Sequence, residues 1–110
     1  MIVVYIASPY TIGNTCENVS KHLHVADTLI GHGFCVIAPL LFHYIDIIHP
    51  RPKDVYMQID FELIKRCDVL IRLEGESAGA DEEIQCARAH DIHVVYSVQE
   101  LIQFRKSLEK

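Results

Sequence analysis

Acidic side chains are concentrated in the stretch RLEGESAGADEEIQCARAHDI, residues 72–92, where an apolar run gives way to a helical pattern. Five carboxylates fall in its first half: Glu74, Glu76, Asp81, Glu82 and Glu83. A carboxylate at such a junction can attack or stabilise an electron-poor sugar carbon, and we expect Glu83, in the first helical turn, to be that group. The alternative is an ordinary solvated helix start, with Asp81 as its N-cap.

The loop before this helix has the composition of a small anion cradle. Gly75 and Gly79 let the backbone turn tightly and approach a ligand closely, and Ser77 adds a hydroxyl group. The amides of residues 79–82 would lie at a helix start, where the helix dipole favours anions. The loop lacks a Gly-Lys-Ser/Thr run, so a P-loop is not predicted.

A second carboxylate, Asp60, interrupts an apolar pattern in MQIDFELIKRCDVLI, residues 57–71. Its direct neighbours are Ile59 and Phe61, and we expect Ile59 on the inward face together with Leu63 and Ile64. An acid among apolar side chains is costly unless it is paired or used in chemistry. The pattern therefore makes Asp60 a catalytic candidate, with a solvated position at the edge of the buried face as the alternative.

The elements that would position these groups alternate regularly. Continuous apolar runs predict buried strands at 2–7, 34–39, 68–73 and 92–97, and helical spacing predicts helices at 15–32, 54–66, after the loop at 74–80, and 98–110. This order predicts one α/β domain over residues 1–110, a three-layer sandwich with a parallel sheet of four or five strands. The segment 40–54 is expected to be a long loop with at most one helical turn, because Pro50 and Pro52 interrupt it.

Ligands of such sheets bind at the carboxyl ends of the strands, near the switch in strand order. The loops SPYTIGN, PLLFHY and EGESAGADEE follow three of the predicted strands and hold most of the unusual residues. The predicted substrate-binding residues are Ser8, Pro9, Tyr10, Thr11, Asn14, His43, Ser77 and Gly79.

Composition excludes several classes of function. The chain has 110 residues, half of them hydrophobic, and a formal net charge of −5, so a nucleic-acid polymer is not an expected partner. No apolar run is long enough to cross a membrane, and the apolar start lacks the basic residues of a signal peptide. The four cysteines form no Cys-x-x-Cys pair and suggest a reducing, cytoplasmic location.

The histidines and one apolar segment give further expectations. His43 and His49 flank Asp46, but we interpret this as a loop with satisfied side chains, without a metal or other cofactor. His22 and His24 are expected to be exposed on the first helix. Helical spacing predicts that the buried side of that helix consists of Val19, Leu23, Ala26, Leu29 and Ile30.

Oligomerisation is expected because a small parallel sheet leaves exposed edges and thin helical cover. The apolar side chains of Tyr44, Ile45, Ile47 and Ile48 could pack on a partner subunit in a homodimer or homotetramer.

Three motifs in this order give the chain a resemblance to a known family. They are VVYIASPY at 3–10, Asp60 eight residues before the Asp68 of CDVLIRL, and Ser-x-Gly-x-x-x-Glu at 77–83. The chain resembles the nucleoside 2-deoxyribosyltransferase-like superfamily, which includes 2'-deoxynucleoside 5'-phosphate N-hydrolases. The resemblance implies a flavodoxin-like sheet, an oligomer, and cleavage of the N-glycosidic bond of a (deoxy)nucleoside or nucleoside 5'-monophosphate.

The resemblance also implies roles for individual residues. Glu83 corresponds to the nucleophile, Asp60 to the acid that assists the leaving base, and Tyr5 to the aromatic residue beside the nucleophile, while Ser77 and Gly79 correspond to the phosphate or sugar-end loop. Water as the acceptor makes such an enzyme a hydrolase, and a second base makes it a transferase.

The sequence departs from the family pattern in its first loop and after residue 18. The first loop lacks a glycine pair with a basic residue, so a phosphate there would rely on Thr11, Asn14 and backbone amides. No asparagine follows Asn18, whereas the transferases use one near the C-terminus, which disfavours base exchange. Two alternatives remain: a phosphoribohydrolase of base-ribose monophosphates, and a non-catalytic nucleotide-binding or sensing module.

Overall fold

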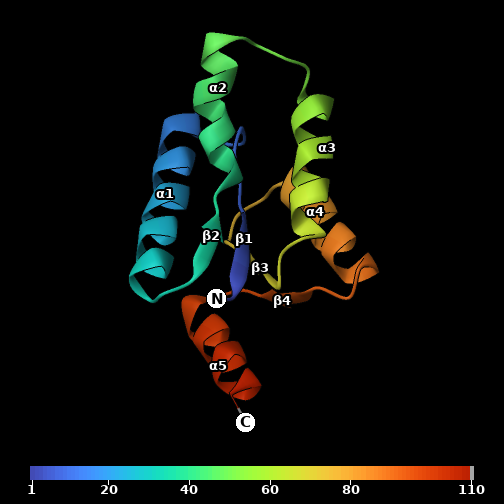
Figure 1. The fold of residues 1–110 in the computed structure, drawn as a ribbon. Helices are drawn as coiled ribbons and strands as arrows, with labels where there is room; N and C mark the ends of the chain where they lie inside the picture. Colours follow the sequence, from blue (N-terminus) through green and yellow to red (C-terminus); the bar gives the residue numbers. More distant parts are fainter. Residues whose placement is uncertain (110) are drawn as a thin grey trace.

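The centre of the molecule is a parallel sheet with strand order β2-β1-β3-β4, seen in Figure 1 in a computed structural model that describes residues 1–109. Over that range the elements are β1 (Val3–Ala7), α1 (Thr15–Gly31), β2 (Cys35–Ile37), the 3-10 turn η1 (Pro39–Leu41), α2 (Phe42–Ile48), α3 (Lys53–Ile64), β3 (Val69–Arg72), α4 (Ala78–Ala89), β4 (His93–Val95) and α5 (Val98–Leu108). None of the helices in this range has the length and apolar character needed to cross a membrane.

Alternating side chains of β1 enter two separate cores, one on each face of the sheet. Val4 and Ile6 pack with residues of α1 and α5, whereas Tyr5 and Ala7 pack with residues of α3 and α4. A strand buried on both faces needs the continuous apolar run seen in the sequence. The architecture is the flavodoxin-like α/β sandwich that the sequence predicted, with four strands in the described residues.

The strand order changes direction at β1. The chain leaves β1 to form β2 on one side, and then returns to form β3 on the other side, where Tyr5 of β1 lies opposite Leu70. The crevice at the carboxyl ends of β1 and β3 is therefore the expected ligand site of the fold. Ser8 follows β1 directly and Ser77 follows β3 at the start of α4.

The segment 40–54 is mostly helical, which corrects the prediction of a long loop. Pro39 begins η1, where its fixed backbone angle suits a helix start, and α2 then runs without glycine or proline to Ile48. Pro52 is the N-cap of α3, where its missing N–H group is not needed. The prolines therefore delimit two helices instead of preventing them.

Side-chain caps fix where the helices begin. The Asn14 carboxamide accepts a hydrogen bond from the Glu17 N–H at 3.0 Å, so α1 begins at Thr15. Ser77 caps α4, since its Oγ accepts from the Ala80 N–H at 3.1 Å, so Asp81 is not the N-cap that the alternative interpretation placed there. Glu83 consequently lies one turn further into the helix than the sequence suggested, over the sheet instead of at its edge.

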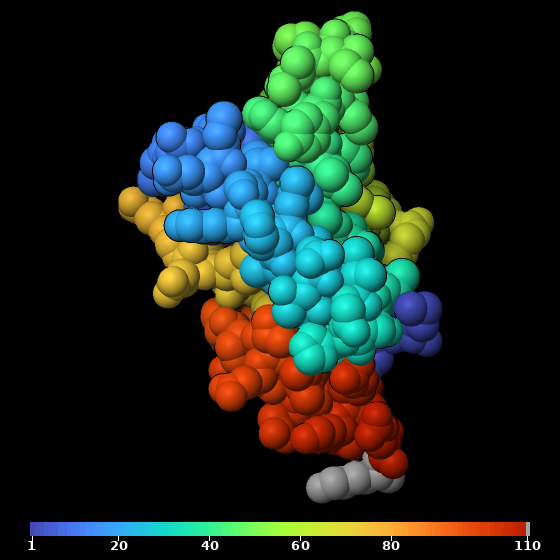
Figure 2. All heavy atoms as spheres, turned by 90° about the vertical axis from the view of Figure 1, so that its left-hand side faces the viewer, coloured from blue at the N-terminus to red at the C-terminus, as the bar shows by residue number. Residues whose placement is uncertain are grey.

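α2 and α5 project at opposite ends of an elongated molecule whose extents are 45 × 27 × 23 Å (Figure 2). The outer side of α2 is apolar: Tyr44, Ile45, Ile47 and Ile48 are 51%, 46%, 65% and 84% exposed. On α3, Ile59 is also exposed, at 40%, although an inward position was predicted. The molecule thus presents an apolar surface on the helix that lies beside the ligand crevice.

Candidate active site

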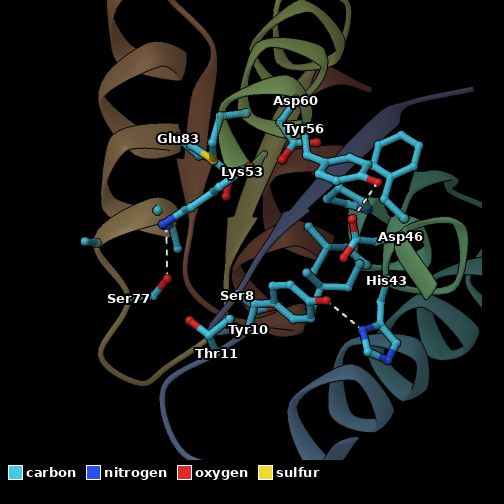
Figure 3. Close-up of a pocket in the computed structure, with 18 of the residues that line it drawn as sticks. Ser8, Tyr10, Thr11, His43, Asp46, Lys53, Tyr56, Asp60, Ser77 and Glu83 are labelled. Atoms are coloured by element: carbon cyan, nitrogen blue, oxygen red, sulfur yellow. Dashed lines mark hydrogen bonds between the residues drawn. The ribbon is translucent and has the colours of Figure 1, made fainter. Parts of the chain in front are cut away.

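A cavity of about 300 Å³ opens at the carboxyl edge of the sheet, a volume at the lower end of the range for small-molecule sites (Figure 3). It lies between the loop after β1, α2, α3 and the start of α4. The polar and aromatic residues that line it are Ser8, Tyr10, Thr11, Phe42, His43, Asp46, Arg51, Lys53, Tyr56, Asp60, Ser77 and Glu83. The cavity therefore joins three segments that are far apart in the sequence.

Tyr5 and Glu83 form a buried hydrogen bond next to this cavity. β1 directs the Tyr5 side chain towards α4, and its hydroxyl donates to Glu83 Oε2. Tyr5 is fully buried, and burial raises its pKa far above the usual range, so the phenol keeps its proton. Tyr5 is therefore a permanent donor to one Glu83 oxygen.

Asp60 brings a second carboxyl to the same cavity from α3. It is 9% exposed, and its Oδ1 is buried without a hydrogen-bond partner in residues 1–109. Burial raises the pKa of Asp60 and also that of Glu83, which is 6% exposed and lies close to the Asp60 charge. A buried carboxyl oxygen without a partner marks a position that a ligand can occupy.

Tyr5 and burial act in opposite directions on the pKa of Glu83. The Tyr5 hydroxyl favours the ionised form of Glu83, because it donates to that carboxylate. Burial opposes this and raises the pKa of both carboxyls, that of Glu83 further, so the pair can hold one proton between them, and that proton must lie on Asp60 for Glu83 to act as a carboxylate. The site can thus combine a carboxylate nucleophile with a carboxylic acid.

Aromatic and polar side chains of α2 and α3 form the wall on the right of the view in Figure 3. The Tyr10 hydroxyl lies 2.6 Å from His43 Nδ1. Asp46 Oδ1 accepts from the Tyr56 hydroxyl and from the Arg51 backbone N–H, both at 2.9 Å, and the Arg51 amide lowers the Asp46 pKa. These bonds hold α2 and the 49–52 turn against the cavity.

Arg72 has a structural role beside the cavity. Its guanidinium is buried and donates to the carbonyl oxygens of Leu73 and Gly75, the latter at 2.8 Å. Its ionic partner is Asp81, at 3.2 Å. Arg72 therefore braces the loop before α4, and Lys53 and Arg51 are the cationic residues at the cavity.

The structure brings most predicted binding residues together. Six line the cavity: Ser8, Tyr10, Thr11, His43, Ser77 and Gly79. Asn14 caps α1 instead. Pro9 packs against Gly75, where φ is +115° and an added Cβ would lie 2.8 Å from Pro9 Cγ, so Gly75 serves this contact and not a ligand.

Tyr56, Met57 and Phe42 are among the lining residues that the sequence did not predict as site residues. On α3, which carries Tyr56 and Met57, a ligand wall and a core face have the same inward-facing pattern. Phe42 lies in PLLFHY, which the sequence placed at the crevice, but only His43 of that loop was predicted to bind a ligand.

His22 is fully buried, although an exposed position was predicted. Its Nδ1 lies 2.7 Å from Ser8 Oγ, directly behind the cavity wall. No group of three or more His, Cys, Asp or Glu side chains with metal-binding proximity occurs in the part of the chain that the structure describes.

Fold and site together define a doubly wound α/β domain with a paired-carboxyl cavity at its switch point. The chain belongs to the family DUF4406, described as a domain of unknown function, which matches residues 2–96. No curated protein matches the chain. The matched range contains every residue of the cavity and ends just before α5.

Proposed function

We propose that this protein is a nucleoside 2-deoxyribosyltransferase-like enzyme that cleaves the N-glycosidic bond of a (deoxy)nucleoside or nucleoside 5'-monophosphate. The observation that supports it most directly is the cluster of Tyr5, Glu83 and Asp60 at the cavity. N-glycosidic cleavage passes through an oxocarbenium-like state, which a buried carboxylate stabilises and can trap covalently.

In the first step Glu83 attacks C1' of the sugar. A bond forms between a Glu83 carboxylate oxygen and C1', and the C1'–N bond breaks with its electron pair moving to the base. Asp60 supplies the proton that the departing base takes up, so the base leaves neutral and Asp60 becomes a carboxylate. Tyr5 holds Glu83 in position through its hydrogen bond.

In the second step an acceptor releases the sugar. The water oxygen attacks C1' while Asp60 takes a proton from that water. The bond between C1' and Glu83 breaks, and Glu83 regains its negative charge. A second base in place of water would give base exchange. The chain has no asparagine beyond Asn18, so we favour the hydrolase.

The two ends of the cavity suit the two ends of a nucleotide. Figure 3 shows Ser8, Thr11 and Ser77 on the side away from His43 and Asp46. Hydroxyl groups suit a sugar or phosphate, whereas the wall of Tyr56 and His43 suits a flat base. Both recorded bonds of Asp46 end on Oδ1, so its Oδ2 can accept a hydrogen bond from an exocyclic amine of the base.

The test is an assay for release of free base from purified protein. The panel contains ribo- and deoxynucleosides and their 5'-monophosphates, each with and without an acceptor base. Glu83→Gln tests the nucleophile, and Glu82→Gln is the matched control, because Glu82 is its exposed neighbour. Free base with wild type and Glu82→Gln, but not with Glu83→Gln, is the expected result.

Other outcomes identify the alternatives. Turnover of ribose 5'-monophosphates alone would indicate a phosphoribohydrolase. Binding of a nucleotide without turnover across the panel would indicate a sensing module and contradict the enzyme.

We further propose a homodimer or homotetramer that associates through α2, acting in the cytoplasm without a cofactor. The exposed apolar side of α2 supports the association. All four cysteines are unpaired, which suits a reducing compartment.

A further inference from the structure

His22 is a buried titratable residue that the proposed mechanism does not use. It projects from α1 and has 0% exposure, yet no salt bridge in residues 1–109 involves it. Burying an imidazole is unfavourable unless its ring nitrogens find partners, and an apolar side chain would fill the same space more simply. The contacts of His22 therefore need a reason beyond packing.

The two ring nitrogens of His22 have different partners, and these determine the tautomer. The Leu40 backbone N–H points at Nε2 with a separation of 3.4 Å, so Nε2 is the acceptor. The proton then resides on Nδ1, which must donate to Ser8 Oγ at 2.7 Å. Burial lowers the pKa of His22 to about 4, so the ring stays neutral at physiological pH.

This arrangement determines what Ser8 can do. A serine oxygen that accepts from His22 still has its own O–H proton, and Ser8 lines the cavity. Ser77 has the same arrangement, because its Oγ accepts from the Ala80 N–H. Two hydroxyls on the same side of the cavity are thus free to donate to a bound molecule (Figure 3).

We propose that His22 is a positioning residue that holds the Ser8 hydroxyl as a hydrogen-bond donor to an oxygen of the sugar end of the substrate. The inference rests on the proposed function for the identity of that substrate. The oxygen belongs either to a sugar hydroxyl or to a 5'-phosphate, since both accept hydrogen bonds. His22 itself does not touch the substrate, and its effect passes through Ser8.

The first test needs no substrate. Nitrogen-15 NMR of the imidazole in the wild-type protein reports which ring nitrogen is protonated. We expect the Nδ1-protonated form, with no titration between pH 5.5 and 8. A proton on Nε2, or a charged ring at pH 7, would overturn the proposal whether or not the protein is an enzyme.

The second test replaces His22 by an amide side chain that puts a polar group at the position of only one ring nitrogen, either Nδ1 or Nε2. His22→Asn places an amide N–H near Nδ1 and can still donate to Ser8, whereas His22→Gln reaches towards Leu40 and cannot. Binding of deoxyadenosine and deoxyadenosine 5'-monophosphate is measured in the Glu83→Gln background, so no turnover is needed. Ser8→Ala in the same background gives the reference effect.

We expect His22→Gln and Ser8→Ala each to weaken binding about tenfold, as loss of one hydrogen bond does, and His22→Asn to bind nearly normally. Combining His22→Gln with Ser8→Ala should add nothing further. A loss confined to the monophosphate assigns the oxygen to phosphate, and a loss on both ligands assigns it to the sugar. Equal effects of His22→Asn and His22→Gln, or no effect of Ser8→Ala, would overturn the proposal.

Discussion

At the scale of single residues, the proposed chemistry depends on two buried carboxyls with different surroundings. Glu83 accepts a hydrogen bond from the Tyr5 hydroxyl, while Asp60 Oδ1 is buried without a hydrogen-bond partner in residues 1–109. Two carboxyls of the same kind in water would behave alike. Here the alternation of β1 directs the Tyr5 phenol to Glu83, and in the proposed mechanism Glu83 is the nucleophile and Asp60 the acid.

Replacing Glu83 by Gln should abolish catalysis and stabilise the fold. We expect a loss of about 10³-fold or more in kcat/KM, because the amide cannot form the glycosyl-enzyme. The amide also removes a buried charge, which should raise stability at pH 8 by about 1 to 3 kcal/mol. Thermal unfolding and base-release assays measure the two effects, and a destabilised or fully active Glu83→Gln protein would contradict this account.

The pH dependence of stability follows from the raised pKa of Glu83. The folded protein holds this proton at pH values where the unfolded chain has lost it, so the folded state binds more protons above the ordinary value of 4.5. Stability contributed by this group therefore falls as pH rises from that value. We expect a higher Tm at pH 5.5 than at pH 8, with a smaller difference in Glu83→Gln.

Activity should follow a bell-shaped pH profile, since the pair works with one proton. The acid limb reports loss of the first proton from the doubly protonated pair and the alkaline limb reports loss of the second, and burial raises the pKa values of both carboxyls. Asp60→Asn should lower kcat about 10²-fold or more and remove the alkaline limb. Asp54→Asn, on the exposed first turn of the same helix, is the control. An unchanged alkaline limb in Asp60→Asn would assign it to another group.

At the scale of elements, the start of α4 has a structural role as a helix cap and, in the proposed function, a binding role, and the two can be separated. Ser77→Ala removes the N-cap and should destabilise the fold by about 0.5 to 2 kcal/mol. Ser77→Asp keeps a capping oxygen but presents a negative charge to the cavity. It should keep its stability and lose binding of 5'-monophosphates more than of nucleosides.

The matched control for that pair is Ser97, the N-cap of α5, whose Oγ accepts from the Glu100 N–H at 3.1 Å. Ser97→Ala should reduce stability by a similar amount without changing nucleotide affinity, since Ser97 lies outside the cavity. Chemical denaturation and equilibrium binding distinguish these outcomes. Equal loss of monophosphate affinity in Ser97→Ala and Ser77→Ala would show that stability alone controls binding.

The elements also show what the sequence could and could not predict. The buried strands and the crevice at their carboxyl ends followed from apolar runs. Asp60 was predicted from an interrupted apolar pattern and Glu83 from the acidic helix start, whereas Tyr5 was implied only by the family resemblance. The predicted stripe of α1 is confirmed at Val19, Ala26 and Leu29. It is wrong at Ile30, which is 62% exposed, and it omitted the buried His22, because a polar residue was expected to face solvent. Burial on a helix is predicted from the spacing of its apolar residues, and a buried polar residue such as His22 interrupts that spacing.

The segment 40–54 was misassigned for a different reason. Its prolines were read as breaking one long element, whereas they separate two short ones. The bonds that hold α2 in place, from Tyr56 and Arg51 to Asp46, connect residues of separate elements, so no local pattern in the sequence could show them.

At the scale of the whole molecule, α2 lines the cavity with one side and forms an exposed apolar surface with the other. Its inner side supplies His43 and Asp46 to the cavity, and its outer side exposes Tyr44, Ile47 and Ile48. An isolated seven-residue helix is unstable in water, so α2 depends on tertiary contacts for its position. A partner subunit on the outer side would fix the wall of the cavity from behind.

We therefore expect wild-type protein to be a homodimer or homotetramer by light scattering, and Ile48→Lys to shift it towards monomer, because the charge cannot be buried unpaired. Ile30→Lys is the control, since Ile30 is comparably exposed but lies on α1. If the partner orders α2, the monomeric variant should also show a raised KM while Glu83 chemistry persists at saturating substrate. A monomeric wild type, or dissociation by Ile30→Lys and not by Ile48→Lys, would show that α2 is not the contact surface.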